Sequence, residues 1–183
     1  MRVSIHKHIP DPEQFKQQLL SWSQQFREVV FLDSNSYPQE YSSFDCMLAV
    51  DAFTSLKTDF HNAFEDLKQY QQTTKDWLFG YLSYDLKNDT EPLKSSNLDG
   101  LHFPDLFFFQ PKKILALKGN QLEMHYLLLC DDEIEDDFSE ITQSYYESFV
   151  TLSEVEMSFF SKPNLVIVLQ LLSVKLTDGL AGI

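Results

Sequence analysis

The strongest constraint on the fold is a pair of apolar segments separated by a short turn, in the stretch PDLFFFQPKKILALKGNQLEMHYLLLC. Both segments have the apolar and aromatic content that is typical of strands. Lys118, Gly119 and Asn120 lie between them, and a glycine flanked by polar residues is a frequent β-hairpin turn. The stretch therefore predicts two antiparallel strands, and with them an antiparallel sheet.

Three other segments carry apolar residues at helical spacing. The first begins with Asp11 as an N-cap and Pro12 at the first helical position, which predicts a helix over residues 11–27. The second pattern runs through residues 56–70 and the third through residues 134–149. The third begins in an acidic run, where carboxylates complement the helix dipole and need no ligand to explain them.

Strands are predicted at residues 2–9, 28–34, 44–51 and 77–86, in addition to the hairpin. The resulting order is β-α-β-β-α-β-β-β-α. Adjacent strands interrupted by only occasional helices are typical of an α+β domain. We therefore expect a largely antiparallel sheet with flanking helices.

Composition narrows the possible functions. Hydrophobic residues make up 43% of the 183 residues, enough for one full core. The net charge of −14 argues against nucleic acid and against an anionic membrane surface as partners. The chain begins without the apolar segment of a signal peptide, and its longest apolar stretch is too short to span a bilayer. We expect a cytoplasmic protein in which Cys46 and Cys130 are buried free thiols.

The common catalytic motifs are missing from the sequence: it has no dinucleotide or phosphate-binding glycine loop, no metalloprotease motif and no nucleophile elbow. His6 and His8 alternate on one strand face, but no third ligand follows nearby. We expect this pair to face solvent rather than to hold a metal. The residues alone thus predict no catalytic, cofactor-binding or metal-binding group.

The segment LFGYLSYDL followed by FPDLFFFQPKKILAL resembles a characteristic region of the chorismate-utilising enzymes. Within that group it is similar to the N-terminal part of component I of para-aminobenzoate (aminodeoxychorismate) synthase, a relative of anthranilate synthase component I. These proteins carry a Gly-Tyr-x-x-Tyr-Asp segment and then a Pro-Asp pair that opens a strand. The matching positions are Gly80, Tyr81, Tyr84, Asp85, Pro104 and Asp105. The resemblance implies that Gly80 is a packing glycine, where the strand passes close to neighbouring backbone.

A second block, FLDSNSYPQEYSSFDCMLAVD, resembles the family segment in which a strand ends at a serine and a Tyr-Ser-x-Phe element starts the next strand. In the family this region contributes to a pocket that binds tryptophan. The matching positions are Ser34, Tyr41, Ser42, Ser43 and Phe44. An ordinary capping serine with core aromatics is the alternative explanation. The family often has arginine at the position of Ser43, and feedback-sensitive members have Leu-Leu-Glu-Ser where this chain has Phe-Leu-Asp-Ser, so we expect weak affinity for tryptophan.

The resemblance covers roughly residues 25–130 and implies an α/β sandwich whose N-terminal half packs on a larger, chorismate-binding half. In the family, chorismate, magnesium and the ammonia-activating residues belong to that second half, and a glutamine amidotransferase subunit supplies the ammonia. We expect residues 1–160 to form the N-terminal-like domain. Residues 161–183 are expected to be a linker or a truncated, possibly frame-shifted, start of the other half. The alternatives are an anthranilate synthase domain and a stand-alone, non-catalytic binding or interaction domain.

Overall fold

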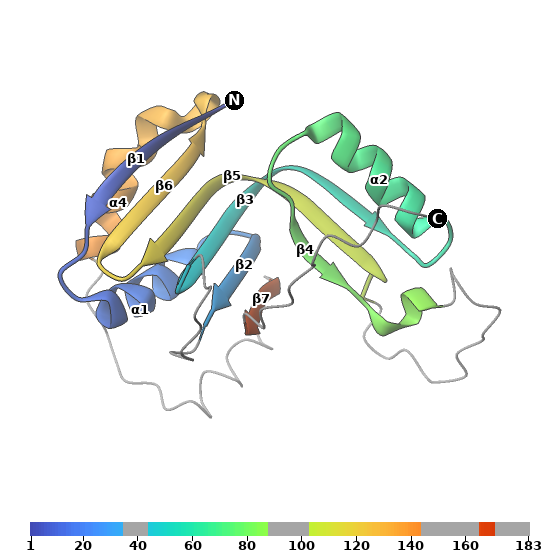
Figure 1. The fold of residues 1–183 in the computed structure, drawn as a ribbon, viewed down its shortest axis with the longest axis horizontal. Coiled ribbons are helices and arrows are strands. Elements are labelled where there is room, and N and C mark those ends of the chain that lie inside the picture. The colour runs from blue at the N-terminus through green and yellow to red at the C-terminus, as the bar shows by residue number, and fades with distance from the viewer. Residues whose placement is uncertain (35–43, 88–102, 144–164, 171–183) are drawn as a thin grey trace, which may run out of the picture.

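The computed structural model describes residues 1–34, 44–87, 103–143 and 165–170 (Figure 1). Their architecture confirms the predicted α+β class, with a largely antiparallel sheet and flanking helices. The strands are β1 (Arg2–His8), β2 (Glu28–Asp33), β3 (Cys46–Thr58), β4 (Phe79–Leu82), β5 (Leu106–Lys118), β6 (Gln121–Leu127) and β7 (Leu165–Gln170). The helices are α1 (Pro12–Ser23), α2 (Ala63–Thr74) and α4 (Ile134–Gln143), with short 3-10 helices η1 (Tyr84–Leu86) and η2 (Leu128–Glu133).

The strands form one sheet in the order β1-β6-β5-β3-β2-β7, and β4 pairs with β5 beside this path. All the pairs are antiparallel except β2 with β7, which is parallel. The sequence pattern does not predict β7, which lies in the segment expected to be a tail. Its backbone pairs with β2 from Glu28↔Leu165 to Asp33↔Gln170.

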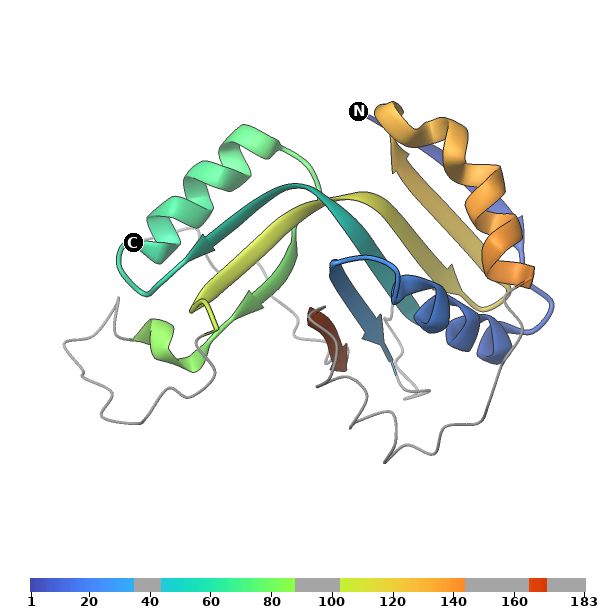
Figure 2. The same ribbon diagram turned by 180° about the vertical axis from the view of Figure 1, so that it is seen from behind.

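The sheet is sharply bent where the long strands β3 and β5 cross its middle (Figures 1 and 2). The register of this pair shifts between Ala52 and Thr54, and Asp51 adopts a positive φ of 60°. Pro111, which has no N–H for the ladder, faces Ala52 at the same point. The bulge divides the sheet into a proximal limb, containing β1, β6, β2 and β7, and a distal limb, containing β4.

The guanidinium of Arg2 lies at this bend. It donates to the carbonyl oxygens of Pro111, Lys112 and His125, the last two at 3.1 Å. Its Nε also donates to the carboxylate of Asp76 at 3.0 Å. Arg2 thereby supplies donors to the carbonyl groups of Pro111 and Lys112 beside the bulge, and it joins β1 to the segment after α2.

A second set of hydrogen bonds ties α2 to the same bend. The Tyr70 hydroxyl accepts from the backbone N–H of Gln110 at 3.1 Å and lies 2.8 Å from the Thr54 hydroxyl. The Gln110 side chain donates to Asp76 at 2.7 Å. Burial alone would raise the pKa of Asp76, but the hydrogen bonds from Arg2 and Gln110 outweigh it and lower the pKa below its ordinary value.

Three groups of buried side chains fill the domain. The outer core lies between the proximal limb and helices α1 and α4, and the α2 core lies under α2 on the distal limb. The third group, which we call the inner cluster, lies on the concave side of the bend and joins both limbs. It consists of Val30, Met47, Ala49, Phe79, Phe107, Phe109, Ile114 and Ala116, with Leu32, Phe44, Ala52 and Tyr81 packed against it.

Three helix boundaries, the end of α1 and both ends of α2, differ from the predicted ones. Helix α1 begins after its Asp11 cap, whose carboxylate accepts from Gln14 N–H at 3.0 Å, but it ends at Ser23 rather than at residue 27. The residues that follow Ser23 are held by hydrogen bonds between positions three apart, such as the one from Phe26 N–H to Ser23 O at 3.1 Å. Helix α2 begins at Ala63, so the predicted start near Leu56 is wrong.

Leu56 instead belongs to β3, which continues to Thr58 and pairs with β5. The helical spacing of Leu56, Phe60 and Leu67 arises because all three pack around the α2 core from different elements. The helix also runs to Thr74, four residues past the predicted end. Here strand pairing overrides the local pattern.

Strand β4 is shorter than predicted because a hydrogen-bonded turn ends it. Ser83 donates both its N–H and its hydroxyl to Asp105, each at 2.7 Å, and η1 follows directly. The hairpin at Lys118–Asn120 is confirmed, with Gly119 at a φ of 54°. The third helix is confirmed for Ile134–Gln143, and its predicted continuation to residue 149 lies outside the described residues.

Lys113 is a buried cation that fastens α4 to the sheet. Its Nζ lies 2.6 Å from carboxylate oxygens of both Asp137 and Glu133, and its side chain is 5% exposed. The Tyr126 hydroxyl donates to the same Asp137 at 2.8 Å. Burial alone would lower the pKa of Lys113, but these carboxylates outweigh it and raise the pKa.

Within the described part of the chain, no helix is long and apolar enough to cross a membrane.

The Lys113→Met variant tests this buried contact. It leaves the Asp137 carboxylate buried without its cation, so we expect the free energy of unfolding to fall by about 3–5 kcal/mol in urea titrations. Lys112→Met is the matched control: its ion pair with Asp51 is about one-third exposed, so the change should stay within about 1 kcal/mol. Equal losses in the two variants would contradict this account.

Candidate functional site

Ser34 follows β2 at the end of the proximal limb. Its N–H donates to Asp45 O at 2.9 Å, and the residue is buried. Val30 and Leu32 of β2 face the inner cluster, and Ser34 continues this alternate set of positions. The preceding residue, Asp33, lies 3.3 Å from the Nζ of buried Lys16 on α1. Hydrogen bonds to Glu13 and Asp33 raise the pKa of Lys16 against the opposing effect of burial.

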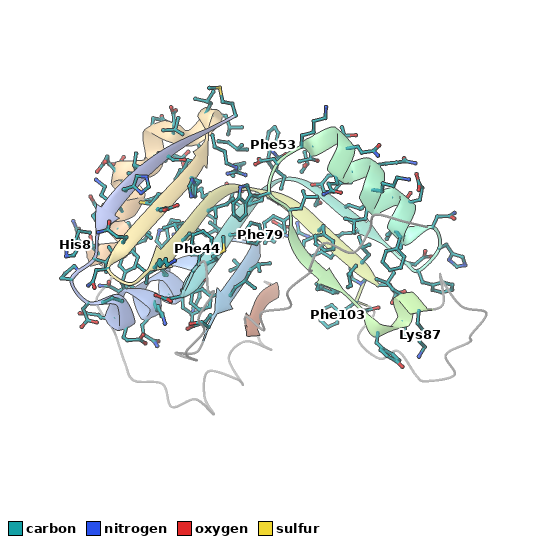
Figure 3. The ribbon with its side chains drawn as sticks, viewed as in Figure 1. His8, Phe44, Phe53, Phe79, Lys87 and Phe103 are labelled. Atoms are coloured by element: carbon teal, nitrogen blue, oxygen red, sulfur yellow. The ribbon has the colours of Figure 1, made fainter. Side chains whose placement is uncertain are left out.

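Phe44 is the second described residue of the predicted amino-acid pocket. It precedes β3 and packs, partly buried, against the inner cluster (Figure 3). Pairing of Asp33 with Cys46 brings the end of β2 beside the start of β3. The structure therefore brings the Ser34 and Phe44 segments together. Tyr41, Ser42 and Ser43 lie outside the described residues.

Gly80 lies where β4 runs closest to β5. It pairs with Phe108, and a Cβ atom at this position would overlap the Phe107 carbonyl oxygen and lie 2.7 Å from the Phe108 Cα. Any side chain would have to displace the backbone of the neighbouring strand. This contact gives a physical reason for glycine in an otherwise bulky strand.

Tyr81 places a polar atom beside the inner cluster. Its hydroxyl is buried and has no hydrogen-bond partner among the described residues, although Phe107 packs against its ring at a centroid distance of 6.0 Å. Burial, and then the charge of Asp105, raise the pKa of Tyr81. A buried hydroxyl without a partner costs about 1–3 kcal/mol, so this group is suited to donate to a polar atom of a bound molecule.

The remaining motif positions divide between turn formation and the surface. Asp105 accepts the two Ser83 hydrogen bonds that end β4. Tyr84 is 81% exposed, and the Lys87 ammonium lies 3.9 Å from its ring centroid. Asp85 and Pro104 are partly buried, and neither has a contact that indicates chemistry. These positions shape the junction between β4 and β5.

The sequence pattern identifies the inner aromatic residues only as strand core. Phe79, which Figure 3 labels, comes from β4, and Phe107 and Phe109 come from β5; all three belong to the inner cluster, and the rings of Phe107 and Phe109 stack with their centroids 5.7 Å apart. The Lys57 ammonium covers the Phe107 ring at 4.8 Å from its centroid. The run of three phenylalanines at the start of β5 is the sequence signal of this surface.

The chemistry available among the described residues is binding chemistry. They contain no group of three or more His, Cys, Asp and Glu residues arranged to hold a metal ion. Cys46 and Cys130 are free and buried as predicted, and burial raises the pKa of both thiols.

His8 lies exposed at the end of β1 (Figure 3), and His6 is also exposed. An open depression at the end of α2, lined by Gln71, Lys75, Asp76 and Trp77, shares no residue with the inner cluster.

Comparison with known proteins does not extend this description: no protein-family model matches the chain, and no curated protein matches it significantly.

The Gly80→Ala variant tests the close approach of β4 to β5. Overlap with the Phe107 carbonyl should lower the free energy of unfolding by about 1–3 kcal/mol in chemical denaturation. Gly119→Asn is the control, because a side chain there meets no atom within 4 Å and asparagine tolerates a positive φ. Its loss should stay below about 1 kcal/mol. A Gly80→Ala protein as stable as the parent would contradict the packing role.

Calorimetric titration with tryptophan tests the amino-acid pocket. The family resemblance assigns the opposite wall of this pocket to the C-terminal half, so Ser34 and Phe44 offer only part of an enclosure. We expect a dissociation constant no tighter than about 1 mM, equivalent to about 4 kcal/mol. A micromolar constant that Ser34→Ala abolishes, and that Ser55→Ala leaves unchanged, would show a complete pocket in this chain.

Proposed function

We propose that this chain is the N-terminal part of component I of an aminodeoxychorismate synthase. The complete enzyme aminates chorismate to 4-amino-4-deoxychorismate for para-aminobenzoate and folate biosynthesis. The observation that carries the proposal is the pair of sequence blocks around Ser34–Phe44 and Gly80–Asp105, in the order and spacing of that family. We propose a cytoplasmic location, as for soluble biosynthetic enzymes of this kind.

The packing of the second block supports this proposal. Its two parts, which 18 intervening residues separate in the sequence (86–103), meet in space because β4 pairs with β5 from Phe79↔Phe109 to Leu82↔Leu106. Gly80 permits the close approach, and the Ser83–Asp105 hydrogen bonds join the Tyr-Asp segment to the Pro-Asp segment. Because the two parts of this motif are in contact in the structure, the match to the family is more specific than a match of residue types alone.

The first block supports a binding role for this part of the enzyme. Ser34 and Phe44 lie at adjacent strand ends, and the hydroxyl of Tyr81 is buried beside the same inner cluster. Hydroxyl and backbone groups suit the charged ends of an amino acid, while aromatic rings suit an indole. We propose that this region forms one wall of a regulatory amino-acid pocket.

Catalysis in the complete enzyme belongs to residues beyond those described. The family uses magnesium, and the described residues do not fit this ion, because no cluster of carboxylates converges among them. No step of the amination is therefore assigned to Ser34, Phe44, Tyr81 or their neighbours. Their role is to build the wall of the binding region, and a glutamine amidotransferase subunit supplies ammonia to the other half.

The experiment is a complementation assay. Purified chain is incubated with chorismate, magnesium and ammonium, alone and with the separately produced chorismate-binding half of an aminodeoxychorismate synthase. We expect no chorismate consumption by the chain alone, because no acid or base is positioned for the reaction in the part of the chain that the structure describes. The mixture should form a complex in size-exclusion chromatography and give more amination than the catalytic half alone.

Three results would contradict the proposal. Chorismate consumption by the chain alone would mean that it contains an active site. Absence of both complex formation and stimulation would favour a stand-alone binding domain. Stimulation of an anthranilate synthase half in preference, detected by anthranilate fluorescence, would move the chain to the tryptophan branch of the family.

A further inference from the structure

Ser4 and His125 face each other across strands β1 and β6 in the proximal limb. The register pairs them directly. Ile9 N–H donates to Asn120 O at 2.8 Å, which marks Ile9–Asn120 as a hydrogen-bonded pair of this ladder. Pair types alternate along an antiparallel ladder, so Ser4–His125, five positions away, is a non-hydrogen-bonded pair. Facing side chains are closest in pairs of that type.

The side chains of this pair continue to a carboxylate. The Ser4 hydroxyl oxygen lies 2.7 Å from His125 Nδ1, and His125 Nε2 lies 3.3 Å from a carboxylate oxygen of Glu123. A carboxylate only accepts, so of the two neutral tautomers it favours the one with its proton on Nε2. Nδ1 then accepts the proton of the Ser4 hydroxyl. The three residues have the serine, base and orienting-acid arrangement of nucleophilic acyl transfer.

The backbone of Ser4 adds a donor beside the hydroxyl. Among the described strands β1 pairs only with β6, so it is an edge strand (Figure 1). In a non-hydrogen-bonded pair the N–H and C=O groups point away from the partner strand. The Ser4 N–H therefore faces the open edge of the sheet. An amide N–H on the nucleophilic residue itself can stabilise the oxyanion that forms during acyl transfer.

We propose that Ser4 is a nucleophile that accepts acyl groups from small activated esters, with His125 as its general base and Glu123 as the orienting acid. The Ser4 oxygen attacks the ester carbonyl and its proton passes to His125 Nδ1. The bond from the acyl carbon to the leaving oxygen then breaks, and the leaving group takes that proton. This gives an acyl ester on Ser4.

The surroundings restrict this reaction to activated esters and leave the release of the acyl group slow. Ser4 is exposed on the sheet, and one amide donor gives less stabilisation than a complete oxyanion hole. Water can later attack the acyl ester and release the acid, with His125 again accepting the proton. We therefore expect a burst of one acyl group per chain followed by slow turnover. The site shares no residue with the amino-acid pocket of the proposed function and does not depend on it.

The test uses the full chain and p-nitrophenyl acetate. Release of nitrophenolate should show a stoichiometric burst, and peptide mass spectrometry should locate the acetyl group on Ser4. Ser4→Ala should abolish the burst. His125→Gln should slow acetylation about 100-fold, the effect typical of removing a general base, and Glu123→Gln should slow it less.

Two control variants distinguish this site from general surface reactivity. Ser55→Ala removes another exposed strand serine, and His6→Gln removes a second imidazole that lies 4.0 Å from Glu123. Both should keep the parent burst, and all variants should keep the circular dichroism spectrum and melting curve of the parent. Acetylation that persists in Ser4→Ala, or that is equally fast in His125→Gln, would overturn the proposal.

Discussion

The bend in the long β3–β5 pair determines how the rest of this domain is built. A thirteen-residue strand pair would normally form one continuous twisted ribbon, but the extra residue between Ala52 and Thr54 and the proline opposite it interrupt the ladder. Carbonyl groups freed at such an interruption need donors, because buried unpaired carbonyls are costly. Arg2, on the edge strand β1, supplies donors to Pro111 and Lys112. One side of the bent sheet carries the helices, and the other gathers the inner cluster.

The parts of the fold that follow from the sequence are those decided by local chemistry. Asp11 and Pro12 mark the start of α1 through the residues next to them in sequence, and Gly119 adopts the positive φ that its turn requires. Leu56 shows the opposite case, because its apolar spacing suits a helix while pairing with β5 makes it a strand. Residues 165–169 form a continuous apolar run, and periodicity alone cannot decide whether such a run is a parallel strand or part of a tail.

The candidate site also combines a residue that the sequence indicates with residues that only the three-dimensional structure brings together. Gly80 is conspicuous in the sequence because glycine is rare among bulky strand residues, and the backbone contact explains it. The buried hydroxyl of Tyr81 depends on which residues surround it in three dimensions, so no pattern in the sequence indicates it. Ser4 and His125 are more than a hundred residues apart and meet only through the β1–β6 register. Sequence spacing can identify such pairs only after the strand order is known.

The pairing of the first strand with β6 also determines when the domain can be completed during synthesis. Arg2 and His125 are separated by 123 positions, and the contacts of Arg2 with Pro111 and Lys112 by more than a hundred. Non-local pairings of this kind form late, because loop closure must precede them. On a ribosome that adds about 5–20 residues per second, β1 would wait roughly ten seconds for its partner strand. During that interval the Arg2 guanidinium lacks its carbonyl partners, and the nascent chain offers an unpaired strand edge to chaperones and to neighbouring chains.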